Sequence, residues 1–226
     1  MKSEGIILDT IDYKESSKII HLYTPQGKIS VKALGANKPK NGLLGFTTIG
    51  NQVSFVTTDA SLPTLMEYNV ESSIYKISED FLRVKCFMVM LNIINHIPID
   101  NNHGPIYSTF KKMLKDILTE NPKKLLCIFL VKMLYAFGIA PNLKTCVSCG
   151  SSDIKFIDLD KGGAFCPSCA TLKNSDELYI FKEYYFGKKE IKDFTACNYD
   201  AMLKSLRDYY FRYASISLKI QDILNE

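Results

Sequence analysis

The chain has 226 residues, of which 46% are hydrophobic and 23% are charged, and its formal net charge is only +4. This composition, without low-complexity tracts or internal repeats, is typical of a globular protein with one large or two modest domains. The longest apolar stretches are interrupted by lysine or asparagine and are too short for a bilayer-spanning helix, which excludes that class of membrane protein.

The first 75 residues have the pattern of short strands separated by turns. Residues 28–34 alternate polar and apolar side chains, as a half-buried strand does, and residues 24–27 form a turn before them. The other expected strands cover residues 6–11, 18–23, 52–56 and 64–70. Five short strands predict a small barrel, for which an OB-like fold is the natural candidate.

A helical pattern begins near residue 78, with Ser78 as the expected N-cap. The helix expected after the Asn121 cap is apolar almost all round, which favours a buried, central position. A last amphipathic helix is expected from Tyr199, with an apolar stripe that continues to Ile220. The expected helical segments cover residues 81–94, 103–118, 122–137 and 199–220.

Four cysteines occur as two Cys-x2-Cys pairs separated by 16 residues: Cys146, Cys149, Cys166 and Cys169. This spacing predicts one tetrahedral zinc site with four thiolate ligands. Four thiolates leave no position for water, so the zinc is expected to be structural rather than catalytic. Two unrelated thiol pairs or a redox motif are the alternatives. The remaining cysteines lie outside the pattern: Cys86, Cys127 and Cys197.

Together these patterns predict an α+β protein with two domains. Residues 1–77 are expected to form the OB barrel, and residues 78–226 a helical domain with an inserted zinc knuckle at about residues 143–172. No signal-peptide pattern opens the sequence, and the arrangement of its seven cysteines suits a reducing compartment. We therefore expect the protein to be soluble and cytoplasmic.

Positive charge is concentrated in the predicted barrel, where residues 14–40 carry six lysines against one acidic residue. A single lysine is more often a solvated surface residue than a ligand contact. The six lysines together, however, suit a polyanion such as nucleic acid. The candidate DNA-binding residues are Lys14, Lys18, Lys28, Lys32, Lys38 and Lys40. The next candidates, on the helix expected at 103–118, are Lys111, Lys112 and Lys115.

Recognisable catalytic motifs are missing from the sequence. It contains no GxxxxGK[ST] phosphate loop, no GxSxG and no HExxH, and its three histidines form no constellation. Asp158 and Asp160, between the cysteine pairs, are expected in a solvated turn rather than in a cation site. We therefore expect no catalytic residues and a binding role instead of an enzymatic one.

The chain resembles the RecO family of bacterial recombinational-repair proteins over nearly its whole length. The segment GIAPNLKTCVSCG leads into the first cysteine pair and is the more specific marker, at residues 138–150. The N-terminal resemblance is carried by residues 13–20, 22–28 and 31–36. The resemblance implies an OB domain followed by a helical domain with a zinc knuckle, and a mediator without enzymatic activity.

The resemblance also implies particular partners. Such proteins bind single- and double-stranded DNA, anneal strands coated with single-strand-binding protein, and join RecR to load the RecA recombinase, in association with the nucleoid. Arg207 and Arg212, beside several aromatic residues, are the candidate contacts for the acidic tail of single-strand-binding protein. Two other classes stay open: an enzyme with an unrecognised active site, and a zinc-ribbon accessory protein of transcription or translation.

Overall fold

The structure is a computed structural model that describes residues 2–38, 42–172, 178–179, 181–183 and 198–224. Its chain divides into two compact units. The first comprises Met1–Phe81 and Ile97–Leu118, and the second comprises Leu82–His96 and Thr119–Glu226. The domain limits of 1–77 and 78–226 stay a prediction, and residues 97–118 group with the strands.

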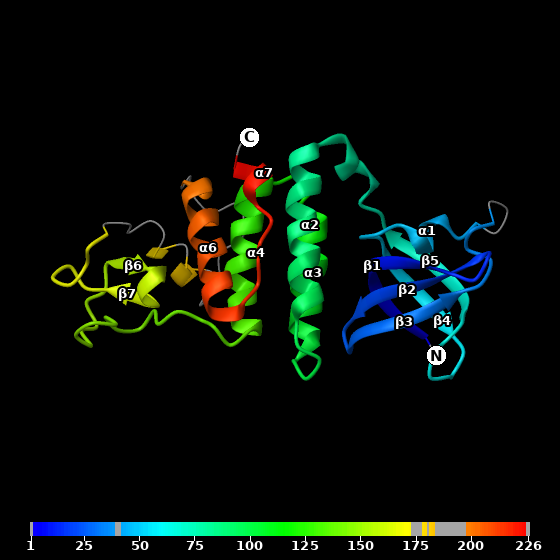
Figure 1. The fold of residues 1–226 in the computed structure, drawn as a ribbon, viewed down its shortest axis with the longest axis horizontal. Coiled ribbons are helices and arrows are strands. Elements are labelled where there is room, and N and C mark those ends of the chain that lie inside the picture. Colours follow the sequence, from blue (N-terminus) through cyan, green and yellow to red (C-terminus); the bar gives the residue numbers. More distant parts are fainter. Residues whose placement is uncertain (1, 39–41, 173–177, 180, 184–197, 225–226) are drawn as a thin grey trace. The chain divides into compact units, whose positions relative to one another are not determined.

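Five antiparallel strands form the barrel of the first unit (Figure 1). They pair in the order β3-β2-β1-β4-β5, and a bridge between Lys32 and Thr64 joins the ends of this order. There the amide of Lys32 donates to the carbonyl of Pro63 at 2.8 Å. This closed arrangement confirms the predicted OB barrel and the α+β class. The strands are β1 (Lys2–Tyr13), β2 (Ser17–Thr24), β3 (Gly27–Ala33), β4 (Gln52–Thr57) and β5 (Leu65–Ser72).

Side chains from alternate strand positions fill the barrel. In β3, Val31 and Ala33 face the core, so the alternate positions Lys28 and Lys32 face outward. The short helix α1 (Leu44–Thr47) adds Phe46, whose ring centroid lies 5.8 Å from that of Phe55. The buried core consists of Ile7, Ile20, Leu22, Val31, Ala33, Phe46, Val53 and Phe55.

Phe46 is the side chain whose loss should most destabilise this barrel. It is 0% exposed, so Phe46→Ala leaves a cavity and should lower the free energy of unfolding by about 3–5 kcal/mol. Urea unfolding followed by circular dichroism measures the change. Leu44→Ala, at a 78% exposed position of the same helix, is the matched control and should stay within about 0.5 kcal/mol of wild type. If both variants lowered the free energy of unfolding by the same small amount, the buried position of Phe46 would be contradicted.

The helix α3 (His103–Asp116) packs on the barrel through hydrogen bonds as well as apolar contacts. The Tyr23 hydroxyl and His103 Nδ1 lie 2.9 Å apart, and His103 Nε2 lies 2.9 Å from the carbonyl of Ile99. Burial raises the pKa of Tyr23, so its hydroxyl keeps its proton. The buried apolar face of α3 consists of Ile106, Tyr107, Phe110, Met113 and Leu114. These contacts fix α3 against β2.

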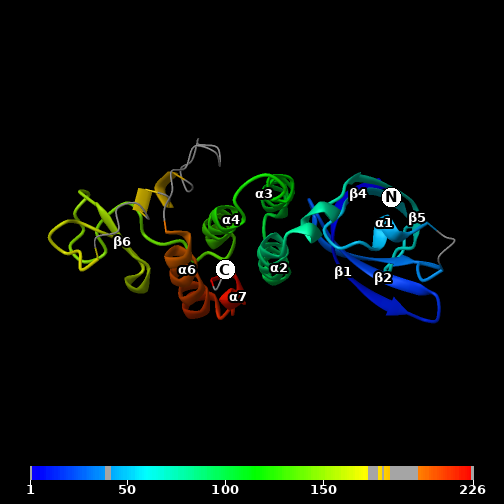
Figure 2. The same ribbon diagram turned by 90° about the horizontal axis from the view of Figure 1, so that it is seen from above.

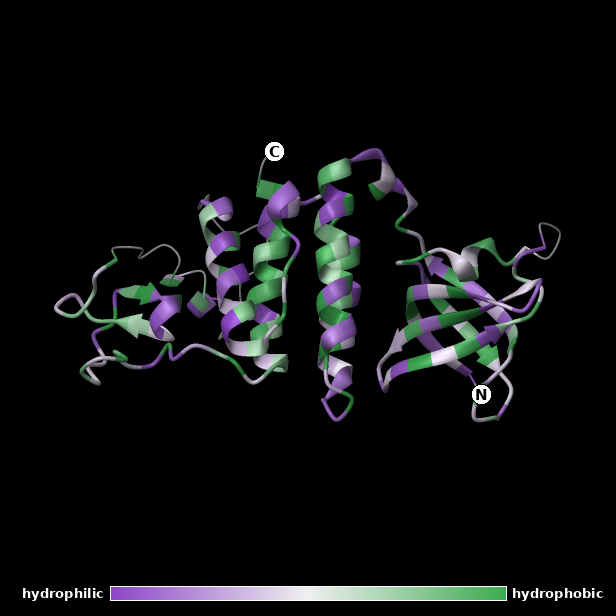
Figure 3. Cartoon of the chain, in the orientation of Figure 1, coloured by the Kyte–Doolittle hydropathy of each residue, from purple (hydrophilic) through white to green (hydrophobic). Residues whose placement is uncertain are grey.

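The second unit includes the helices α2 (Phe81–His96), α4 (Pro122–Ala136), α6 (Tyr199–Ala214) and α7 (Gln221–Leu224). In both Figure 1 and Figure 2, α4 and α6 lie side by side. The Tyr210 hydroxyl donates to the carbonyl of Leu130 at 2.8 Å across this contact. Figure 3 shows α4 as hydrophobic along most of its surface, and most of its residues are buried. The predicted central, buried helix is thus confirmed.

Two predicted helix ends are wrong. Ser78 does not cap α2: it lies in a 3-10 turn, η2 (Tyr75–Glu79), where its hydroxyl donates to the carbonyl of Tyr75 at 2.7 Å. The last helix stops at Ala214, because Ser215 adopts a left-handed conformation with φ of 57°. Ile216 and Ile220 are buried, as expected, but they lie beyond the helix.

Candidate metal centre and nucleic-acid interface

A short hairpin brings the two cysteine pairs together. It consists of β6 (Phe156–Asp158) and β7 (Gly163–Phe165), joined by the 3-10 turn η3 (Leu159–Lys161). Gly162 has φ of 83°, a left-handed conformation that favours glycine. A side chain at Gly163 would collide with the backbone of Asn142, which leads into the first pair. The two glycines therefore have a structural role in folding the chain back on itself.

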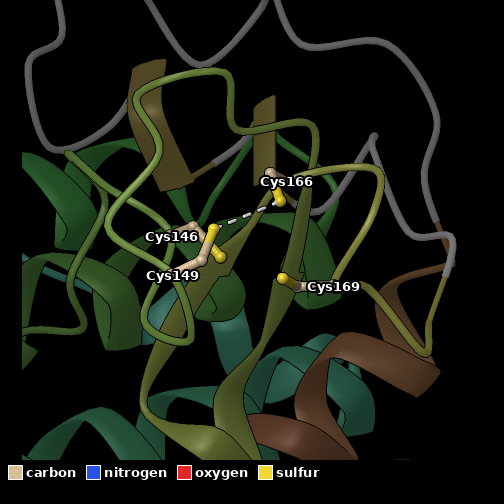
Figure 4. Close-up of side chains that lie close together, drawn as sticks. All are labelled: Cys146, Cys149, Cys166 and Cys169. Carbon is tan, nitrogen blue, oxygen red and sulfur yellow. Dashed lines mark hydrogen bonds between the residues drawn. The ribbon is translucent and has the colours of Figure 1, made fainter.

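The cysteine pairs lie in two turns of similar build. The amide of Gly150 donates to the carbonyl of Cys146 at 2.9 Å, and the amide of Ala170 donates to that of Cys166 at 3.0 Å. In each turn the backbone thus bends so that both thiols of the pair point to the same side. Figure 4 shows the four sulfurs converging from these two turns.

The four Sγ atoms lie within 4.8 Å of one another, and those of Cys149 and Cys166 are 3.7 Å apart. A zinc–sulfur bond of about 2.3 Å in a tetrahedron places neighbouring sulfurs about 3.8 Å apart. The cluster therefore fits a tetrahedral ion of that size and could hold a metal ion. Within the described residues, it is the only group of three or more histidine, cysteine or acidic side chains with this property.

Hydrogen bonds from the backbone favour an ionised sulfur at Cys146. Burial opposes the ionisation of Cys146, but hydrogen bonds from the backbone of Cys166, Cys149 and Ser148 outweigh it and lower its pKa to about 6. Hydrogen bonding to the sulfurs of Cys166 and Cys149 instead raises the pKa of Cys169 to about 12. At neutral pH the cluster thus offers a thiolate, which is the form that binds metal.

The two candidate partner-binding arginines are engaged within the second unit. Arg212 donates to the carbonyl of Asp160 at 2.7 Å and pairs with its carboxylate at 3.2 Å, which joins α6 to η3. Arg207 donates to the carboxylate of Asp208 at 2.8 Å, and this hydrogen bond raises its pKa. Phe211 between them is 67% exposed. Their role in partner binding stays a prediction.

The candidate DNA-binding lysines occupy different environments on the barrel. Lys28 and Lys32 share the outer face of β3, and Lys28 donates to the carbonyl of Ile97 at 3.1 Å. Burial lowers the pKa of Lys28. Lys18 forms an ion pair with Asp12 at 2.7 Å, so part of its charge is compensated within the chain.

Two of the other candidate lysines lie in a turn and a bend. Lys14 follows β1 in a left-handed conformation with φ of 55°, and Lys38 is exposed after β3. Lys40 lies outside the described residues, as does Cys197. The structure thus brings Lys28 and Lys32 together on one face but does not gather all six lysines there.

An open groove of about 940 Å³ begins beside Lys28. The strand β1 contributes Lys2, which the sequence alone does not single out, because it precedes the strand expected at residues 6–11 and carries no signal of its own. Only the antiparallel pairing of β1 with β4 places Lys2 in this groove. The other residues include Ser30, Thr57 and Ser61, so most lining residues are polar, and the two lysines are accompanied by two acidic residues, Glu4 and Asp59.

None of the described helices is long and apolar enough to cross a membrane.

Comparisons with known proteins agree with this architecture. The family model described as recombination protein O N terminal matches residues 1–74, and that described as recombination protein O C terminal matches residues 78–189. The DNA repair protein RecO of Halalkalibacterium halodurans is 29% identical, with 100% of this chain and 94% of that protein covered. The protein of the same name from Bacillus mycoides is 27% identical, with 100% and 96% covered. The chain therefore belongs to the RecO family of DNA repair and recombination proteins.

Proposed function

We propose that this protein is a recombination mediator without enzymatic activity, which binds single- and double-stranded DNA through its OB barrel. The observation that carries the proposal is the RecO family match together with a closed barrel whose β3 directs Lys28 and Lys32 outward, with an open groove that begins at Lys28. Lysines on a barrel face neutralise phosphates, and a groove of this kind follows a strand backbone.

The proposed reaction is the pairing of strands rather than bond chemistry. The protein would anneal complementary strands coated with single-strand-binding protein and, together with RecR, help load RecA. It would do so in the cytoplasm, in association with the nucleoid. Annealing requires the charge of two strands to be neutralised while they lie close together, and clustered lysines supply this.

The metal is proposed to be a structural zinc. Four thiolates would fill a tetrahedral coordination sphere, so no site is left for a water or a substrate. The sulfur separation of 3.7 Å between Cys149 and Cys166 supports an ion with zinc–sulfur bonds of ordinary length. When bound, zinc would supply cross-linking between the two cysteine turns. The hairpin of β6 and β7 has strands of only three residues, which alone bury little surface.

Fluorescence annealing of complementary oligonucleotides coated with cognate single-strand-binding protein tests the proposed function. The protein should accelerate annealing without ATP and without cleaving either strand. Failure to accelerate annealing of coated strands would contradict the mediator role. Binding of bare single strands in the absence of other proteins separates this role from that of a zinc-ribbon accessory protein, which needs a polymerase or ribosome as its partner.

The tail of single-strand-binding protein is proposed to bind at Arg207 and Arg212. Each replacement by alanine should weaken binding of a labelled tail peptide about tenfold, because a charge-assisted hydrogen bond contributes about 1.5 kcal/mol. A fluorescence titration measures this change. Binding of bare DNA should be unaffected.

Matched controls exist because each arginine has an acidic partner. Asp160→Asn and Asp208→Asn remove the ion pairs with Arg212 and Arg207 but leave the cations in place. Both controls should keep or strengthen peptide binding, since the guanidinium becomes more available. If Asp160→Asn weakens peptide binding as much as Arg212→Ala, the arginine acts only through its attachment to η3, and the tail site lies elsewhere.

A further inference from the structure

A second groove lies between α3 and the barrel, within the first unit. It has a volume of about 860 Å³ and is lined on the barrel side by Glu4, Gln52 and Ser72 of β1, β4 and β5. From α3, the lining includes three lysines: Lys111, Lys112 and Lys115. Most of the lining residues carry polar or charged side chains, which suits a charged ligand.

Two of these lysines form no ion pair within the described part of the chain. Lys111 pairs with Glu4 at 2.8 Å and thereby neutralises the acid nearest to it. Lys112 and Lys115 are exposed and form no ion pair with any described residue. Lys111 and Lys115 lie one helical turn apart, and Lys112 lies beside them. The α3 side of the groove therefore presents three lysines against one acidic residue, Asp116.

The two grooves adjoin. Glu4 and Pro25 line both of them, so the surface that begins at Lys28 continues past Pro25 to α3. The combined lining carries five lysines and three acidic residues, with Glu4 counted once, and so has a net charge of +2. A continuous, polar and positively charged path fits an extended polyanion better than it fits a compact small molecule.

The position of α3 along this path is fixed by contacts with the barrel. His103, at the start of α3, is held by Tyr23 and by the carbonyl of Ile99, each at 2.9 Å. Further along the helix, the Gln52 amide donates to the carbonyl of Lys111 at 3.4 Å. These attachments hold the backbone of α3, from which the lysines project, beside the barrel. A preorganised row of cations binds a strand at a lower entropic cost than mobile lysines do.

We propose that the groove along α3 holds the sugar–phosphate backbone of the same single strand that the barrel binds, so that the binding site extends from Lys28 and Lys2 to Lys112 and Lys115. Lysines contact phosphates as point charges without reading the bases, so the extension adds affinity and length but no sequence preference. The inference rests on the proposed DNA binding by the barrel and assigns a second segment to that site.

Binding of oligonucleotides of two lengths tests the extension. A thymidine oligomer of about 6 nucleotides is in the range that one OB barrel covers, whereas one of about 20 exceeds it. The double variant Lys112→Ala/Lys115→Ala should bind the short oligomer like wild type and the long one more weakly. For the long oligomer, the slope of log K against log salt should fall by about 1.4, at about 0.7 for each phosphate that is no longer neutralised.

The matched control is Lys204→Ala/Lys219→Ala. It changes the net charge equally at two exposed lysines that line neither groove. It should leave the slope of log K against log salt unchanged for both the short and the long oligomer. An α3 variant with wild-type affinity and slope on the long oligomer would overturn the inference, as would an equal loss of affinity in the control, which indicates a mere effect of net charge.

Two further outcomes separate this inference from the proposed function. Equal weakening on both lengths would place α3 within the short barrel site and overturn the extension while DNA binding stands. Loss of binding to an acidic tail peptide without loss of binding to long DNA would make the groove a peptide site, which also overturns it. Wild-type protein that binds neither oligomer would contradict the proposed function itself, and the extension with it.

Discussion

Replacing Cys166 with serine should remove the metal and destabilise the second unit. Cys166 is 5% exposed, and its sulfur faces those of the other three cysteines (Figure 4). A serine hydroxyl is a poor replacement for a thiolate ligand, and the binding free energy of a structural zinc is part of the folding free energy. A loss of about 4 kcal/mol would lower the melting temperature by about 8–16 °C in a chain of this size.

Elemental analysis measures the zinc content, and calorimetry measures the melting temperature. Wild-type protein purified without chelator should contain one zinc ion per chain, and Cys166→Ser should contain none. Cys86→Ala is the matched control, because Cys86 is a buried cysteine of α2 outside the cluster. It should keep its zinc, although it too loses some core packing. Wild-type protein without zinc, or Cys166→Ser protein with one zinc ion per chain, would contradict the proposed site.

Patterns between residues close in the sequence, such as side-chain alternation and cysteine spacing, predicted the strands and the cysteine cluster correctly. Alternation of side chains in the segment of β3 predicted a half-buried strand, because one face of that strand lies on the barrel core. The cysteine spacing predicted a cluster, since each Cys-x2-Cys turn brings its own two thiols together and only one reversal of the chain is then needed. That reversal occurs at Gly162 and Gly163.

The predictions that failed or fell short depended on contacts between distant segments. Ser78 is suited to an N-cap and also to a 3-10 turn, and the sequence does not distinguish these two uses. Ser215 ends α6 in a left-handed conformation that usually favours glycine, so no local signal marked the end. Lys18 was selected for its charge alone, whereas the register of β1 and β2 places it opposite Asp12. Such pairings follow from register, which residue type does not reveal.

Removing four lysines of the barrel should reduce the affinity for DNA irrespective of its sequence. The variant carries alanine at Lys28, Lys32, Lys38 and Lys40. The structure supports the first two as a pair on the outer face of β3, and shows Lys38 exposed in the loop that follows. For single strands, the salt slope should fall by about 0.7 for each phosphate that the variant no longer neutralises, and so by about 2.8 if all four lysines bind DNA. Fluorescence anisotropy over a series of salt concentrations measures the DNA affinity and its salt slope.

Two control variants make this result specific. Alanine at Lys144, Lys155, Lys204 and Lys219 removes the same charge from exposed positions of the second unit and should leave the slope unchanged. Asp12→Asn removes the ion-pair partner of Lys18, so it should strengthen DNA binding if Lys18 contacts phosphate. Because Lys28 also donates to the carbonyl of Ile97, the melting temperature of the quadruple variant must stay close to that of wild type. A stable quadruple variant with wild-type affinity and slope would place the DNA site away from the outer face of β3.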